Sequence, residues 1–234
     1  MSVASSVMKI RLNDVSHPAS LSYRLRAKRD VRLRSLILDI AHQRPGPVRI
    51  LDLGGSVDYW RRVGVDFLRQ HQARITVLNN VATELHAEGA EEMFSTAVGD
   101  ACNMSHVKDG AFDLVHSNSV IEHVGGWSRM KALASEVRRL APRYYVQTPY
   151  QWFPIDPHRW RFPMIHWLPQ SLQAKLMMAL PICYAGRLRC LNEAHDHLEH
   201  LEMIDRSQFR LLFPDADLHN EMVLGLTKSL VAIR

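Results

Sequence analysis

The sequence predicts one α/β domain with a doubly wound, mostly parallel seven-stranded sheet and an antiparallel last strand. Three observations lead to this fold class. Short apolar runs alternate with helical stretches from residue 48 to residue 147, which is typical of parallel βαβ units. The first run, Val48–Leu53, has no polar alternation, as in a strand buried on both faces. Near the C-terminus two short strand-like runs flank a glycine link, which favours a hairpin.

The elements before residue 148 follow from turn signals and periodicity. Pro45-Gly46-Pro47 ends a basic helix and starts the first strand, so residues 1–47 are expected to be an N-terminal arm followed by that helix. Pro142 ends the last helix of this region. The predicted strands are 48–53, 74–80, 95–98, 111–117 and 143–147, and the predicted helices are 57–71, 81–93 and 127–140.

The alternation stops after the fifth strand. Residues 148–202 are rich in Pro, Trp and His and show no regular strand, so we expect an inserted lid within a domain that spans 48–234. Order resumes with a helix over 205–213, a strand over 217–224 and a last strand over 228–233. The link Gly225–Thr227 predicts that the last strand runs antiparallel to its neighbour.

Composition places the chain among ordinary globular proteins. Apolar residues make up 47% and charged residues 23% of its 234 residues, and no apolar run is long enough to cross a bilayer. A secretory signal pattern is missing at the N-terminus, where Lys9 and Arg11 interrupt the apolar residues. The three cysteines lack CxxC spacing, which argues against disulfides or a zinc ribbon and favours a reducing, cytoplasmic setting.

Residues 24–34 concentrate the net charge of +5. They hold six cations against Asp30 alone, while the segment's apolar residues form a broken helical stripe: Leu25, Leu33, Leu36, Ile37 and Ile40. The favoured interpretation is a helix that packs beside the first strand with a solvated basic face. Peripheral contact with an anionic membrane and contact with nucleic acid are the alternatives.

The first strand leads directly into a glycine turn. Asp52 lies near the end of the apolar run, and Gly54 and Gly55 let the backbone turn tightly and approach a ligand. Ser56 or Asp58 can then cap the following helix, whose free N–H groups point into the same crevice. Ligands of open α/β sheets bind beyond the strand ends. The sequence therefore predicts a nucleotide-like small-molecule site near residues 52–58.

Five features in this order resemble the class I S-adenosylmethionine-dependent methyltransferases, which have a Rossmann-like fold. They are the glycine turn, the end of the second strand, Gly99-Asp100-Ala101, the segment FDLVHSNSVIEHV (Phe112–Val124) and the terminal strand pair. The fourth is the most specific and is similar to small-molecule methyltransferases. A dinucleotide dehydrogenase fits less well, because the GxGxxG pattern is absent.

The resemblance implies S-adenosyl-L-methionine as cofactor and a set of residues that bind it: Asp52, Gly54, Gly55, Ser56, Asn79, Asn80, Asp100, Ala101 and Ser117. Asp100 would accept a hydrogen bond from the adenine amino group. Asn79 stands where relatives usually carry a ribose-binding acid. An amide still forms hydrogen bonds but brings no charge, so this departure predicts a modest loss of affinity.

Candidates on the acceptor side follow the fourth and fifth strands. His123 comes just after strand four, beside the expected methyl-donor crevice, and His158 lies at the start of the lid. Both are candidate catalytic residues, as base or as substrate contact. Asp156 and Arg159 are candidate substrate-binding residues, with Arg159 as an anion clamp. The alternative is that these polar groups cap a helix start or fix a proline-rich loop.

No metal ligands are assigned from the sequence. The run Glu193–Glu202 holds His195, His197 and His200, but it has neither HExxH nor a cysteine partner and is interpreted as a solvated polar segment. The aromatic residues of the lid, including Trp152, Trp160 and Trp167, are expected mainly to form its small core. Leu172–Gly186 is expected to be buried in the lid, with membrane contact as the alternative.

The predicted function is methyl transfer from S-adenosylmethionine to a small-molecule acceptor, with a sugar or glycan-linked metabolite as the first candidate. Nucleic acid is not the favoured partner. An RNA methyltransferase that uses the basic helix is one alternative, and it predicts that the helix's cations face the crevice. A cofactor-binding module without catalysis is the other, motivated by Asn79 and the shortened glycine loop.

Overall fold

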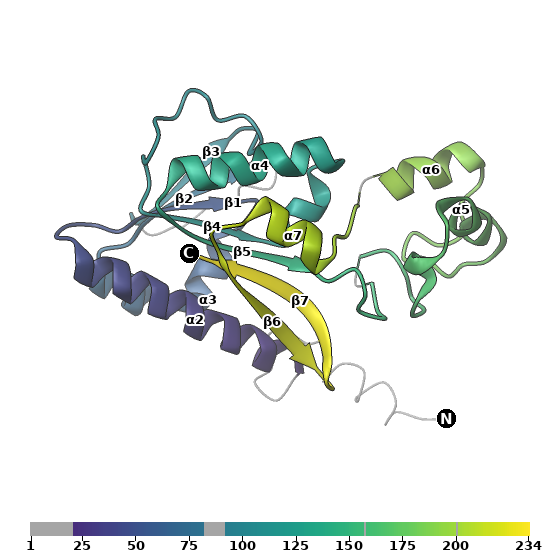
Figure 1. The fold of residues 1–234 in the computed structure, drawn as a ribbon, viewed down its shortest axis with the longest axis horizontal. Coiled ribbons are helices and arrows are strands. Elements are labelled where there is room, and N and C mark those ends of the chain that lie inside the picture. Colours follow the sequence, from purple (N-terminus) through teal and green to yellow (C-terminus); the bar gives the residue numbers. More distant parts are fainter. Residues whose placement is uncertain (1–20, 82–91, 157, 200) are drawn as a thin grey trace.

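The computed structural model describes residues 21–81, 92–156, 158–199 and 201–234 and confirms the predicted fold class. Seven strands form one sheet in the order β3-β2-β1-β4-β5-β7-β6 (Figure 1). The first five strands of the chain are parallel, and β7 runs antiparallel to both β5 and β6. The strands are β1 Arg49–Leu53, β2 Arg74–Asn79, β3 Phe94–Val98, β4 Leu114–Asn118, β5 Arg143–Pro149, β6 Asp217–Val223 and β7 Leu226–Ile233.

The strand order fixes where a ligand can bind. From β1 the chain continues outward through β2 to β3, and then returns to the other side of β1 for β4 and β5. Two connections that leave in opposite directions open a crevice at the carboxyl ends of β1 and β4. The glycine turn after β1 and the segment after β4 therefore meet at this crevice.

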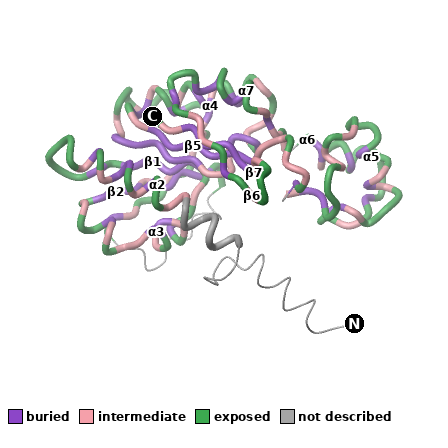
Figure 2. Tube along the Cα trace, turned by 60° about the horizontal axis from the view of Figure 1, so that its bottom comes forward, coloured by how far each residue is buried: buried purple, intermediate pink, exposed green. Residues whose placement is uncertain are grey.

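Helices cover both faces of the sheet and bury a separate core on each (Figures 1 and 2). Helices α4 (Trp127–Leu140) and α7 (Arg206–Leu212) pack Leu133, Val137 and Phe209 against one face. Helices α2 (Leu21–Gln43) and α3 (Val57–Gln70) cover the other face. Neighbouring residues of β1 divide between the two cores, as alternation along a strand requires.

Helix α2 packs against the sheet, as we expected for the helix that contains the basic segment 24–34. Leu33, Leu36, Ile37 and Ile40 are buried against the sheet and α3. Among the cations whose side chains are described, Arg32 is exposed and Arg34 lies over the ring of Phe67, 4.5 Å from its centroid. Arg29 instead pairs with Glu221 and donates to Asn118 at the end of β4.

The lid is a small unit beside the sheet, drawn at the right of Figure 1. It contains α5 (Gln170–Ala179) and α6 (Leu191–Glu199) around a core of its own, with Trp160, Met177 and Cys183 fully buried. Its ends meet in a parallel bridge between Tyr150 and Ile204. Within the described residues of 148–202, regular strand is confined to the last residues of β5, because β5 runs on to Pro149.

The terminal hairpin is tighter than predicted. Its turn is Leu224-Gly225, not Gly225–Thr227, so β6 ends at Val223 and β7 begins at Leu226. Both turn residues have positive φ, 49° and 80°. This is the two-residue turn whose twist matches the flanking strands. The predicted helix at 81–93 and the arm at 1–20 lie largely or wholly outside the described residues. No described helix is long and apolar enough to cross a membrane.

Candidate functional site

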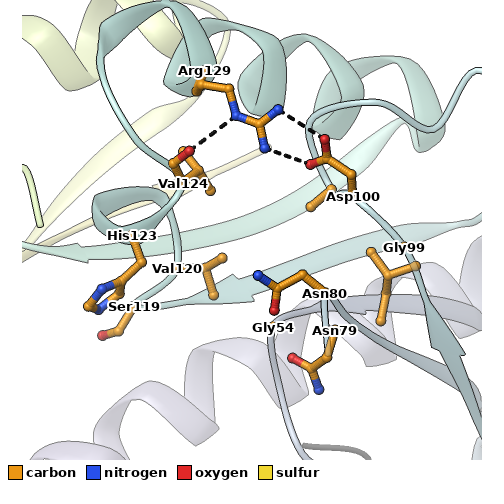
Figure 3. A pocket seen from close by; sticks show the side chains of 12 residues that line it. Gly54, Asn79, Asn80, Gly99, Asp100, Ser119, Val120, His123, Val124 and Arg129 are labelled. Carbon is orange, nitrogen blue, oxygen red and sulfur yellow. Dashed lines mark hydrogen bonds and ion pairs between the residues drawn. The ribbon is translucent and has the colours of Figure 1, made fainter. Parts of the chain in front are cut away.

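A cavity of about 460 Å³ opens at the carboxyl ends of β1, β2 and β4, as the strand order requires (Figure 3). Its wall combines the glycine turn, the ends of β2 and β3, the segment after β4 and one side chain of α4. The lining residues are Gly54, Leu78, Asn79, Asn80, Gly99, Asp100, Ala101, Ser119, Val120, His123, Val124 and Arg129.

The glycine turn approaches the opposite wall closely. Gly54 has φ +66°, and a Cβ there would lie 2.6 Å from a methyl carbon of Val120. Its N–H donates to the Leu78 carbonyl (2.7 Å), which ties the turn to β2. Ser56 caps α3 by accepting from the Tyr59 N–H. The turn is therefore fixed on both sides with its backbone at the cavity.

Asp52 lies beneath this turn and does not line the cavity. Its carboxylate is fully buried, accepts from Trp60 Nε1 (2.7 Å) and bonds His116 Nδ1 (2.6 Å). A Cβ on Gly55 would come within 1.6 Å of its Oδ2. Asp52 thus supports the turn from below. His116, which stacks on Tyr59, is a partner that the sequence analysis did not identify.

The second strand contributes two asparagines with different roles. Asn79 is buried and donates from Nδ2 to the Gly55 carbonyl (3.1 Å), so it also holds the glycine turn. Asn80 is exposed and lines the cavity. Both remain predicted cofactor contacts, with Asn80 the one whose polar atoms face the opening in Figure 3.

Asp100 forms the outer end of the cavity together with Arg129. Two hydrogen bonds of 2.9 Å join the carboxylate to the guanidinium, and the Cys102 N–H donates to the same carboxylate. These bonds, first those from Arg129, lower the pKa of Asp100. The carboxylate is thus held ionised at the edge of the cavity, and its contact with an adenine amino group stays a prediction.

Arg129 was missed in the sequence analysis. It lies in the first turn of α4, where a cation is unfavourable to the helix dipole. A cation at this position could have indicated a functional partner in the sequence, because a nearby anion compensates its unfavourable interaction with the helix dipole. Its Nε also donates to the Val124 carbonyl, so one side chain joins α4, the loop before it and Asp100.

The segment after β4 carries the acceptor-side candidates. His123 lines the cavity, and its ring meets that of His158 edge-on, with centroids 5.0 Å apart. Glu122 is fully buried behind them and accepts from Thr148 Oγ1 (3.1 Å). Burial raises the pKa of Glu122 to about 7, and burial followed by the charge of His123 lowers the pKa of His158. The two candidate catalytic histidines therefore come together from different parts of the chain.

Like Asp52, Gly55, Ser56 and His158, the predicted residues Ser117, Asp156 and Arg159 are not part of the cavity lining. Ser117 is buried in β4, two residues before the cavity-lining Ser119. Asp156 accepts from the backbone N–H groups of His158 and Arg159. Arg159 donates to the carbonyls of Leu198 and Leu201 and so holds the two ends of the lid together. These contacts favour the loop-fixing interpretation, and acceptor binding by Asp156 and Arg159 stays a prediction.

The remaining lid candidates divide by exposure. Trp160 is buried in the lid core, whereas Trp152, Trp167 and Phe162 are exposed to solvent. On α6, His195 is exposed, and His200 lies outside the described residues. Within the described part of the chain, the group with metal-ligand geometry is elsewhere and comprises Glu122, His123 and His158.

Comparison with known proteins agrees with this geometry. Residues 59–143 match the family described as methyltransferase domain. This match agrees with the resemblance to S-adenosylmethionine-dependent methyltransferases and with the cofactor of that class. A search among curated proteins finds no match.

Solved structures of low identity share the fold. The CurJ carbon methyltransferase aligns with a TM-score of 0.57 at 12% identity, over 87% of this chain and 53% of that chain. This chain thus spans about half the length of that protein. DhpI in complex with S-adenosylhomocysteine gives 0.52 at 14%, covering 97% and 92%. A methyltransferase from Methanosarcina mazei gives 0.51 at 14%, covering 83% and 94%.

Proposed function

We propose that the protein transfers the methyl group of S-adenosylmethionine to a hydroxyl group of a small molecule, with sugars and glycan-linked metabolites as the first acceptors to test. One observation carries this proposal. The glycine turn and Asp100 line one part of the cavity, and Ser119 and His123, whose ring meets that of His158, line another; we assign the first part to the methyl donor and the second to the acceptor.

The chemistry asks little beyond positioning. The sulfonium already activates the methyl group, so the site must align an acceptor oxygen with the S–CH₃ bond, and well-oriented reactants supply on the order of 7–11 kcal/mol. The oxygen forms the new bond to the methyl carbon, the C–S electron pair stays on sulfur, and the acceptor proton is lost to solvent on the side of the two histidines. S-Adenosylhomocysteine is the other product.

A small acceptor is favoured over RNA by the described part of the basic helix. The RNA alternative predicts cations that face the crevice and are free to bind phosphates. Arg29 is instead paired with Glu221 (2.7 Å), and Arg34 packs on Phe67. The side chains of residues 21–28 lie outside the description.

Calorimetric titration with S-adenosylhomocysteine tests the donor side. We expect micromolar binding to the wild-type protein and a loss of about tenfold or more in Asp100→Ala, since a hydrogen bond to a charged group contributes about 1.5–3 kcal/mol. Asp66→Ala, which removes a fully exposed carboxylate, is the matched control. Absence of binding at millimolar ligand would contradict the assignment of this cavity to the cofactor.

Labelled methyl transfer tests the acceptor side. With cofactor binding established, the protein is incubated with a methyl-labelled donor and a panel of sugars, and with RNA as a comparison. Incorporation into a sugar that falls in His123→Ala supports the proposal. Cofactor binding without turnover on any acceptor would favour the non-catalytic module, and incorporation into RNA alone would favour that alternative.

A further inference from the structure

We propose that Glu122, His123 and His158 bind a divalent transition-metal ion, zinc above all, at the acceptor side of the cofactor cavity. This site departs from the sequence analysis, which assigned no metal ligands. Binding of the ion stands independently of the proposed function, whereas its role in methyl transfer rests on that function.

The donor atoms are close enough to share one ion. Each residue offers one ligand atom, and all three atoms lie within 4.8 Å of one another. Ligands of a tetrahedral zinc site, at about 2.0–2.1 Å from the metal, lie about 3.3 Å apart. Side-chain rotations that move each ligand atom by about 1 Å or less would therefore bring the three atoms to the spacing of a zinc site. The edge-on contact of the two imidazoles is compatible with such convergence.

A buried carboxylate oxygen lacks a partner at this point. Glu122 is fully buried, Thr148 donates to its Oε2, and its Oε1 has no hydrogen-bond partner. A buried acceptor without a partner is costly, and a carboxylate without one is especially so. A metal ion supplies the missing partner and the compensating charge in one step.

His158 has the surroundings of a ligating histidine. Asp156 lies behind it, with Oδ1 3.7 Å from His158 Nδ1, and Asp156 is itself fully buried. Carboxylates commonly stand behind metal-bound imidazoles, where they fix ring orientation and raise ligand basicity. Asp156 also accepts from the His158 N–H, so it fixes the backbone that presents the ring.

The chemistry of the ligands selects the kind of ion. Two imidazoles and one carboxylate suit zinc and its neighbours in the first transition series, whereas magnesium and calcium prefer sites built from oxygen ligands. Three protein ligands also leave a coordination position open, as in catalytic zinc sites.

The location gives the ion a use. His123 lines the cavity, so an ion held by its ring would lie at the wall that we assign to the acceptor. An acceptor hydroxyl bound to the ion is more acidic and loses its proton to solvent. Its oxygen then forms the bond to the methyl carbon while the C–S bond breaks and the electron pair remains on sulfur. The ion also joins the lid to the segment after β4.

Zinc titration of chelator-treated protein tests the site. We expect one ion per chain, with affinity at least tenfold weaker in His158→Ala and unchanged in His195→Ala, which removes an exposed lid imidazole outside the cluster. Cobalt substitution reports the ligand set through its visible absorption. A spectrum that persists in His158→Ala, or the absence of saturable zinc binding to the wild-type protein, would overturn the proposal.

Two further measurements separate this proposal from the proposed function. His123→Ala changes an exposed ligand and guards against a folding defect in variants of buried Glu122; it should also weaken zinc binding, with an unchanged circular dichroism spectrum. S-Adenosylhomocysteine is titrated into metal-free protein. Zinc binding without cofactor binding would refute the proposed function alone, and cofactor binding without zinc binding would refute the metal site alone.

Discussion

Several of the predicted cofactor-binding residues support the backbone beneath the cavity. Asp52 lies near the end of the first apolar run and was a predicted cofactor contact, yet its carboxylate bonds Trp60 and His116 under the glycine turn. Asn79 likewise donates to the turn. The residues that resemble cofactor ligands are therefore in part the supports of the backbone that would meet the cofactor.

Gly55→Ala tests this support. The added Cβ would lie 1.6 Å from Asp52 Oδ2, and the buried carboxylate is held by two partners, so the turn must shift. We expect a loss of about 1–3 kcal/mol in the free energy of unfolding in urea, together with weaker S-adenosylhomocysteine binding. Gly126→Ala is the control, because its Cβ would meet only Glu202, at 3.9 Å. Equal stability of the two variants would contradict the tight approach.

Among the elements, the terminal hairpin has a turn residue whose type conflicts with its backbone conformation. Leu224 is 97% exposed and adopts φ 49°, a left-handed conformation that leucine disfavours by roughly 1–2 kcal/mol. The antiparallel pairing of β6 and β7 nevertheless reaches the turn, with Val223 opposite Leu226 and a register shift between Glu221 and Met222. Pairing thus outweighs the preference of one residue.

Replacing Leu224 with asparagine should relieve this conflict. Asn-Gly is the preferred pair for such a two-residue turn, so Leu224→Asn is expected to stabilise the protein by about 1 kcal/mol. The comparison is Leu226→Asn, a half-exposed strand position where asparagine is unfavourable. The melting temperatures of the two variants and the wild type test this prediction. A lower melting temperature for Leu224→Asn would contradict it and would mean that the leucine side chain makes a stabilising contact.

At the scale of the whole molecule, an ionic group at the far end of the sheet ties its parts together. Asp113, just before β4, accepts from the backbone and side chain of Arg49 in β1 and from Arg44 after α2. Burial alone would raise the pKa of Asp113, but the hydrogen bonds from Arg49 outweigh burial and lower it. This carboxylate therefore stabilises the fold while it is ionised.

The sign of the shift predicts an acid dependence. The stabilisation is present above the unfolded pKa of about 3.9 and disappears as the pH falls through the lower folded value. Asp113→Asn should cost about 1.5–3 kcal/mol at pH 7, and the difference from wild type should shrink below pH 4. Urea unfolding at both pH values measures this, with Asp66→Asn as the exposed control. A difference that stays constant with pH would refute the ionic origin.

The sequence predicted the sheet better than the site. Alternating apolar runs determine which strands are parallel and buried, and the helix Trp127–Leu140 was found with its observed bounds. Asp100 was found from its motif, whereas Arg129, 29 positions later, was not, because only the folded chain brings α4 to the end of β3. The same holds for Glu122 and His158, because local sequence patterns identify each residue but only the tertiary structure brings them together.

The two ends of the lid segment lie next to each other, and this has a consequence for how such proteins could diversify. Tyr150 and Ile204 lie side by side, so the chain leaves and re-enters the sheet domain at one point. A segment joined in this way can be exchanged between homologues as a cassette without disturbing the strand ladder. Of the three clustered residues, Glu122 and His123 follow β4, and His158 lies in the lid. Exchange of the lid would replace one of these three residues and leave the glycine turn and Asp100 in place.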